Sequence, residues 1–243
     1  MKKAVLPGEA KNPLLTIDSL LRHHVSRRGE IRARLAEFKE TWRQGDLAIF
    51  RELCFCILTA NTSAKMGITC IEAAGDEILT ADAEGIRHIL CGRYRFWKTR
   101  PEYIVHTREY LREKNALPPT ISRRLAPPSP TGGEGLKNKI ESLSDFHERR
   151  DFFADNPGVK GLGYKEASHF LRNIGFEGYA ILDIHVVRLL HELGVLPEAK
   201  RPANKKQYIF MEERMREFSK DVKIGMDELD LALWSYRTGE ILK

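Results

Sequence analysis

The stretch GLGYKEASHF contains a lysine, Lys165, directly after a glycine-rich turn and at the start of a helical pattern. Glycine tolerates a left-handed backbone and lets another backbone approach closely, so we expect Gly161 and Gly163 to form a turn before a helix over Tyr164–Asn173. Amides at a helix start are unpaired and favour a phosphate. The pattern predicts a helix-hairpin-helix over about 156–173 that clamps a nucleic-acid backbone. A glycine-capped corner between two helices is the alternative.

Lys165 stands where a lysine can act as a nucleophile. An ordinary lysine is almost entirely protonated near neutral pH, but a helix N-terminus and partial burial both favour the free amine. A free amine can attack an electrophilic carbon and form a Schiff base. A lysine that only contacts phosphate fits the same position equally well.

A carboxylate follows eighteen residues later, in the stretch AILDIHVVRLLHEL. Asp183 precedes an amphipathic segment from Ile184 to about Leu193, and aspartate is a preferred N-cap, worth about 1 kcal/mol. A carboxylate has spare lone pairs, so one oxygen can cap the helix while the other faces a reaction centre.

The elements that must position these residues read as helices. Apolar residues recur three and four apart in residues 49–60, 140–154 and 226–236, and strand alternation is absent, which predicts an all-α protein of about ten helices. Residues 115–135 hold five of the eleven prolines. We expect a flexible, solvent-exposed insertion there, because such a run cannot continue a helix.

Composition narrows the class of protein. Forty Lys and Arg residues against 34 Asp and Glu residues give a net charge of +6, which suits an anionic partner such as nucleic acid. No apolar stretch has the length of a signal peptide or a membrane span, so we expect a cytoplasmic protein without a membrane partner. Cys54, Cys56, Cys70 and Cys91 lack metal-ligand spacing, and we expect them to be buried small hydrophobes.

The combination of GLGYKEA, a glycine-containing connection and LDIHVVR resembles the helix-hairpin-helix, Gly/Pro-Asp superfamily of base-excision DNA glycosylases. Bifunctional members carry a lysine where Lys165 stands, and monofunctional members lack it. ELCFCILTANTSAKMG resembles the start of the family's helical barrel. Asn61 falls where endonuclease III-like relatives place a residue that fills the gap left by a flipped base. The proline usual just before the motif aspartate is missing, since Ile181 and Leu182 stand there.

Endonuclease III-like enzymes end in a four-cysteine iron-sulfur loop, whereas no cysteine follows Cys91 here. The ending DELDLALWSYRTGEILK instead resembles the second, archaeal-type family of 8-oxoguanine DNA glycosylase/AP lyases. The resemblance spans about residues 14–243 except the insertion. It implies two helical subdomains, 14–48 with 183–243 and a barrel over 49–182, with the active site in the cleft between them.

The resemblance also implies a chemistry. Asp183 would stabilise positive charge on the sugar as the glycosidic bond breaks, and Lys165 would attack C1′ to give an imine that allows β-elimination. We expect no metal and no cofactor. The partner would be double-stranded DNA that contains oxidised guanine, and the protein would act as a monomer at the nucleoid.

Base recognition is assigned through the same resemblance. Asn61 would fill the gap that the flipped base leaves in the duplex. Phe96 and Trp234 would offer aromatic faces to the flipped base, with core packing as the alternative for both rings. Lys243 is tied to lesion discrimination through its terminal carboxylate, because 8-oxoguanine carries a hydrogen at N7 where guanine has a lone pair. A frayed terminus is the alternative for Lys243.

Two other functions remain open from the sequence. One is a glycosylase/lyase for another oxidised base, with the same Lys165 and Asp183 and a different pocket. The other is a non-catalytic helix-hairpin-helix protein in which Lys165 and the hairpin only grip phosphates.

Overall fold

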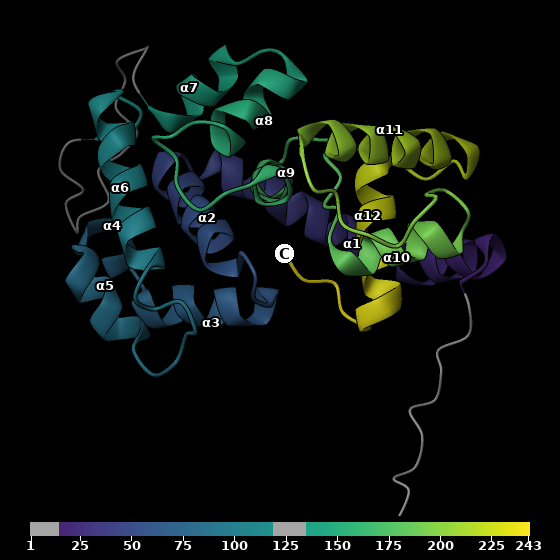
Figure 1. Ribbon diagram of the computed structural model, residues 1–243, viewed down its shortest axis with the longest axis horizontal. Coiled ribbons are helices and arrows are strands. Elements are labelled where there is room, and N and C mark those ends of the chain that lie inside the picture. Colours follow the sequence, from purple (N-terminus) through teal and green to yellow (C-terminus); the bar gives the residue numbers. More distant parts are fainter. Residues whose placement is uncertain (1–14, 119–134) are drawn as a thin grey trace, which may run out of the picture.

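The computed structural model describes residues 15–118 and 135–243, and within these ranges the chain forms twelve α-helices and no strand (Figure 1). The all-α prediction is confirmed, with more helices than the ten expected. The predicted insertion at 115–135 lies outside the described residues except at its two ends.

The helices form two groups on either side of α9, which Figure 1 shows end-on near the centre. The helix α9 (Tyr164–Asn173) belongs to the first group. The other members of that group are α2 (Asp46–Thr59), α3 (Ala64–Ala74), α4 (Glu77–Thr80), α5 (Ala83–Leu90), α6 (Arg100–Glu113), α7 (Leu136–Ser142) and α8 (Phe146–Ala154). The second group comprises α1 (Ile17–Arg43), α10 (Ile184–Glu192), α11 (Lys205–Asp221) and α12 (Met226–Thr238).

Each group has its own hydrophobic core. The first core surrounds the apolar helix α2 and includes the inner face of α9. The second is built by α1, α10, α11 and α12. The Tyr179 side chain belongs to the first core, and the side chain of the next residue, Ala180, belongs to the second. The short segment that leads to Asp183 therefore crosses from one core to the other.

Two of the three helices expected from apolar spacing are confirmed, since α2 and α12 cover residues 49–59 and 226–236. The expectation of one helix over 140–154 was wrong. The helix breaks into α7 and α8 because the Asp145 carboxylate accepts the His147 and Glu148 amides, both at 2.8 Å, and so caps a new helix start. An aspartate that can cap competes with helix continuation.

The cysteine prediction holds for three of four residues. Cys54, Cys56 and Cys70 are buried, and Cys91 is exposed. The expectation for Cys91 was wrong because it ends α5 on the solvent side, where its thiol has no core to join.

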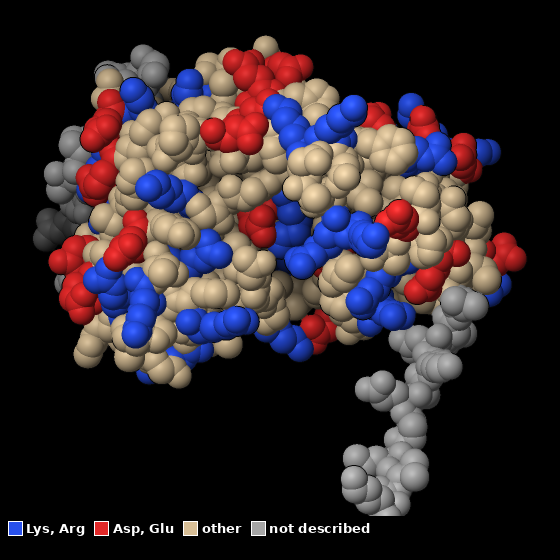
Figure 2. Space-filling view, in the orientation of Figure 1, with Lys and Arg blue, Asp and Glu red and all other residues tan. Residues whose placement is uncertain are grey.

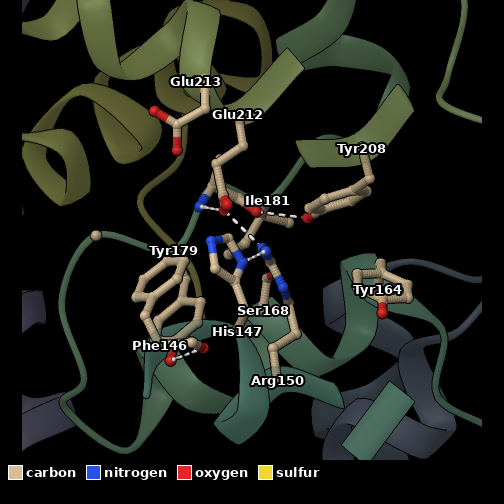
Figure 3. Close-up of polar contacts among 12 residues, drawn as sticks. Phe146, His147, Arg150, Tyr164, Ser168, Tyr179, Ile181, Tyr208, Glu212 and Glu213 are labelled. Atoms are coloured by element: carbon tan, nitrogen blue, oxygen red, sulfur yellow. Dashed lines mark hydrogen bonds and ion pairs between the residues drawn. The ribbon is translucent and has the colours of Figure 1, made fainter. Parts of the chain in front are cut away.

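A fully buried ion pair joins the two groups (Figure 3). Arg150 of α8 and Glu212 of α11 are both 0% exposed, and Arg150 Nη1 lies 2.7 Å from Glu212 Oε1. The same oxygen accepts the Ala180 amide at 3.1 Å, and the Tyr208 hydroxyl donates to the Ala180 carbonyl at 2.5 Å. The backbone before Asp183 is therefore fixed by side chains of α8 and α11.

A second buried pair acts on the next residue. Arg172 Nη1 of α9 lies 2.6 Å from Asp230 Oδ2 of α12, and Asp230 Oδ1 accepts the Ile181 amide at 3.0 Å. Burial raises the pKa of Asp230 to about 6, and the Arg172 charge works against that rise. A proline at Ile181 would have no N–H to donate, so the residue found there has a bonding role of its own.

We expect Glu212→Gln to lower the free energy of unfolding by about 3–5 kcal/mol, because it leaves the Arg150 charge buried without a counter-ion. Urea unfolding measures the change. The control is Glu177→Gln, which breaks the exposed Lys39–Glu177 pair and should cost less than about 1 kcal/mol. Equal losses in the two variants would contradict a special role for the buried pair.

Candidate active site

The hairpin lies between α8 and α9, and α9 begins at Tyr164, as predicted. Its two predicted glycines have different roles. Gly161 has a φ of +88°, and a Cβ there would lie 2.8 Å from the Tyr103 ring. Gly163 is the N-cap of α9 with an ordinary φ of −104°, and a Cβ there would meet only Glu166 Oε2, at 3.5 Å. The fold requires glycine at 161, whereas at 163 the protein has room for a Cβ beside the Glu166 carboxylate, which accepts the Gly163 amide.

Asn61 lies in the turn between α2 and α3, next to the hairpin. It is exposed and has a left-handed backbone, with a φ of 62°, which asparagine tolerates better than most residues. Arg100 ties the two turns together, because it donates to the carbonyls of Ala60 (3.3 Å) and Gly161 (3.4 Å). Asn61 and the hairpin glycines therefore present one connected surface.

Two hollows meet at Lys165. The first, the inner hollow, has a volume of about 480 Å³ and lies between α9, α12 and the start of α10. The second, the outer groove, has a volume of about 790 Å³ and runs past the hairpin and the segment before α11. Lys165 lines both hollows, so it lies at the place where the outer groove and the inner hollow adjoin.

The structure brings most of the predicted site residues to these two hollows. Lys165, Asp183, Trp234 and Lys243 line the inner hollow. Asn61, Gly161 and Gly163 line the outer groove together with Lys165.

Phe96 lines neither hollow. Its ring packs edge-on against Tyr94, and the guanidinium groups of Arg95 and Arg100 lie 5.1 and 5.4 Å from the centre of the ring. Contact between Phe96 and a flipped base stays a prediction that this arrangement does not support.

Asp183 caps α10 as predicted. Its Oδ1 accepts the amides of His185 and Val186, both at 2.8 Å. Within the described parts of the chain no donor reaches Oδ2, and the residue lines the inner hollow. One oxygen is thus engaged by the helix, and the other is available to a ligand.

The Lys165 amine has one carboxylate close by. Its Nζ lies 3.0 Å from Glu166 Oε1, and the other oxygen of Glu166 accepts the Gly163 amide at 3.3 Å. Glu166 therefore links Lys165, the predicted nucleophile, to the helix start. The Lys165 side chain is 27% exposed, so a substrate can reach it.

Reasoning from the sequence missed His169, which also lines the inner hollow. Its ring is 7% exposed, and its Nε2 has no hydrogen-bond partner among the described residues. Burial, followed by the charges of Arg172 and Lys165, lowers the His169 pKa well below its usual value, so the ring is neutral. Its position one helical turn after Lys165 was the available signal, because residues four apart share a helix face.

Basic side chains gather over the boundary between the two groups of helices on the face shown in Figure 2. The outer groove is lined by Arg100, Lys165, Lys200, Arg201 and Lys205. Lys205 is paired with Asp151 at 2.6 Å, and Lys200 with Glu198 at 3.0 Å. Such a groove suits a polyanion that passes over the hairpin.

No described helix is long and apolar enough to cross a membrane. Residues 15–118 and 135–243 also bring together no group of three or more His, Cys, Asp or Glu side chains that could hold a metal ion. A reaction without metal or cofactor stays a prediction.

Comparison with known proteins identifies the family. The sequence model of the family described as 8-oxoguanine DNA glycosylase matches residues 31–224. A protein of Methanocaldococcus jannaschii named 8-oxoguanine DNA glycosylase/AP lyase is 36% identical over 211 residues, which cover 86% of this chain and 90% of the relative. A protein of Korarchaeum cryptofilum with the same name is 37% identical over 214 residues, or 88% of this chain and 90% of the relative.

Solved structures agree with the sequences. The crystal structure of the M. jannaschii 8-oxoguanine glycosylase/lyase in complex with 15mer DNA containing 8-oxoguanine superposes with a TM-score of 0.76 at 33% identity, and the match covers 92% of this chain and 99% of that one. The chain therefore belongs to the 8-oxoguanine DNA glycosylase family. The resemblance to the archaeal-type family is confirmed.

We expect Gly163→Ala to weaken DNA binding and Gly161→Ala to lower the stability of the fold. At 163 a methyl group has room in the protein, so the free energy of unfolding should change little, while binding to duplex DNA weakens about tenfold through lost access to the helix start. At 161 the left-handed backbone and the Tyr103 contact should cost about 1–3 kcal/mol of stability. Urea unfolding and fluorescence anisotropy measure the two effects. Unchanged DNA binding by the alanine variant at 163 would count against a phosphate grip.

Proposed function

We propose that this protein excises 8-oxoguanine from double-stranded DNA and then nicks the strand at the abasic site through a Schiff base on Lys165. One observation carries the proposal: Lys165 lines both the basic outer groove and the adjoining inner hollow. A nucleotide turned out of a duplex in the groove would place its base in the hollow and its sugar at the amine. The relatives' printed activity agrees with this use.

The DNA would be held mainly by its backbone. Extrusion of one nucleotide costs a few kcal/mol of pairing and stacking, which contacts in the pocket must offset. Asn61, exposed beside the hairpin, would fill the space left in the duplex. The open helix start at Gly163 and the cations of the outer groove would hold the phosphates.

The base would lie in the inner hollow, beside Trp234 and Lys243. Trp234 is partly buried against the second core, and its ring is accessible from the hollow. An acceptor on Lys243 directed at N7 would favour the lesion, which carries a hydrogen there, over guanine, whose lone pair would face it. An unpaired buried acceptor costs about 1–3 kcal/mol, enough for roughly a 5- to 150-fold preference.

The chemistry would use Lys165 and Asp183 together. As the bond between C1′ and the base breaks, its electron pair leaves with the base and positive charge builds on the sugar, near the free oxygen of Asp183. The Lys165 amine forms a bond to C1′. The bond between C1′ and the ring oxygen then breaks, the ring oxygen takes up a proton as a hydroxyl, and the nitrogen loses its protons to give the open-chain imine. The imine acidifies C2′, and removal of that proton expels the 3′ phosphate by β-elimination. Water hydrolyses the imine and frees Lys165, so the products are the free base, one strand that ends in an unsaturated aldehyde and one that ends in a 5′ phosphate.

Action as a monomer, the absence of an iron-sulfur cluster and work at the nucleoid, all expected from the sequence, are parts of the same proposal. A panel of duplexes that differ only in the damaged base, assayed for base release, separates 8-oxoguanine from other oxidised bases as the substrate.

We expect Lys165→Gln to abolish the covalent adduct that borohydride traps with lesion-containing duplex, because an amide cannot form an imine. DNA binding should remain within about threefold, since the phosphate grip uses backbone amides and several other cations. Gel analysis of the trapped adduct and anisotropy measure the two properties. An undiminished adduct in this variant would remove Lys165 from the mechanism.

We expect Asp183→Asn to retain the fold and slow excision. Asparagine caps helices as well as aspartate does, so α10 should keep its start. Loss of the negative charge beside the developing cation should lower single-turnover base release by about 10²–10³-fold. Circular dichroism serves as the control for folding. A rate close to that of the unmodified protein would show that Asp183 is only a cap.

A further inference from the structure

One buried carboxylate interrupts the apolar helix at the centre of the first core. Of the buried residues of α2, nearly all are apolar, and Glu52 is the single charged one, at 4% exposure. A buried carboxylate is costly unless it is paired and hydrogen-bonded. Its partners therefore indicate what the residue is for.

The partner of Glu52 comes from the far end of the sequence. Lys243 Nζ lies 2.7 Å from Glu52 Oε2, and the same ammonium lies 5.2 Å from the centre of the Phe55 ring one turn further along α2. Residues 239–243 leave α12 in the second group and reach α2 in the first, where Figure 1 marks the chain end between the two groups. Glu240 pairs with Lys65 at 2.6 Å and the Ile241 carbonyl accepts from Arg34 at 3.4 Å, and the Glu52 contact then fixes the Lys243 side chain in the inner hollow.

Glu52 is itself held in place. Its Oε1 accepts the Asn173 side-chain amide at 2.7 Å, and Asn173 Oδ1 accepts from Arg172 Nη2 at 3.0 Å. Arg172 is the buried partner of Asp230, which holds the Ile181 amide. A continuous run of buried polar contacts thus connects the seat of Lys243 with the segment that ends at Asp183.

We propose that Glu52 is a positioning residue for lesion recognition: it seats Lys243 so that the backbone of that residue meets the Hoogsteen edge of an oxidised purine in the inner hollow. The proposal rests on the proposed function. Discrimination between a hydrogen and a lone pair at N7 requires an acceptor fixed within a fraction of an ångström, and a loose chain end would adapt to either. Glu52 does not touch the base and acts through Lys243.

Three variants test the proposal: Glu52→Gln, Lys243→Met and the two combined. The readout is the single-turnover rate of 8-oxoguanine release divided by the rate of nicking at a preformed abasic site, which needs no base recognition. We expect each single change to lower this ratio about tenfold. The double variant should lower it no further, because both single changes break the same contact.

The matched control is Asp76→Asn. It removes the carboxylate that pairs with Arg51, the neighbour of Glu52 in α2, at a site away from the hollow, and should leave the ratio unchanged. Glu52→Gln leaves the Lys243 ammonium on a side chain that is 37% exposed and can be hydrated, whereas Lys243→Met leaves the buried Glu52 carboxylate without a counter-ion. The double variant removes both charges and serves if Lys243→Met folds poorly.

Two outcomes would overturn the proposal. One is a ratio unaffected by Glu52→Gln, either because both rates are unchanged or because both fall equally, which indicates a structural role. The other is single effects that multiply in the double variant. Failure of the proposed function is distinguishable, because the unmodified protein would then release no 8-oxoguanine at all.

Discussion

Two buried carboxylates hold the active-site frame together. Glu212 and Asp230 each pair with an arginine from the first group of helices, and each accepts one amide of the two-residue stretch Ala180–Ile181. In a low-dielectric interior neither arginine nor carboxylate can lose its partner without a large cost in free energy. The chain therefore enters α10 at one place and in one direction, and Asp183 follows directly.

This constraint explains how residues of two separate cores can act on one substrate. Lys165 belongs to the helix at the boundary, and Asp183 lies between Leu182 and Val186 of the second core, yet both line one hollow. The two hairpin glycines also have different roles. Gly161 is required by the fold, whereas Gly163 leaves room beside the start of α9. In the proposed function, rigid placement of both sides lets adjoining surfaces bind the DNA backbone and the base.

Local patterns predicted the parts of the site that depend on local structure. The start of α9 at Tyr164 and the capping role of Asp183 follow from turn and cap preferences that act over a few residues. The break between α7 and α8 was missed because apolar spacing continues through it while the cap at Asp145 decides the backbone. The exposed position of Cys91 depends on which side of α5 faces solvent, which its neighbours in sequence do not reveal.

Long-range contacts were beyond such patterns. Glu52 and Lys243 are separated by 191 positions, and only the packing of residues 239–243 across the two groups makes them partners. The glutamate inside an apolar helix was visible as an anomaly, but its meaning depends on the tertiary structure. The resemblance to the family supplied Trp234 and Lys243, which composition and spacing alone would have left as core packing and a frayed end.

The central claim is that Lys165, among the lysines that line the inner hollow, is the one that meets the sugar. Lys65 and Lys243 line the same hollow, so each of them could form the covalent bond in place of Lys165. The most direct test is to reduce the covalent complex with borohydride, digest it and locate the modified lysine by mass spectrometry. We expect a deoxyribose-derived adduct on Lys165 alone, and an adduct on Lys65 or Lys243 instead would remove Lys165 from the mechanism.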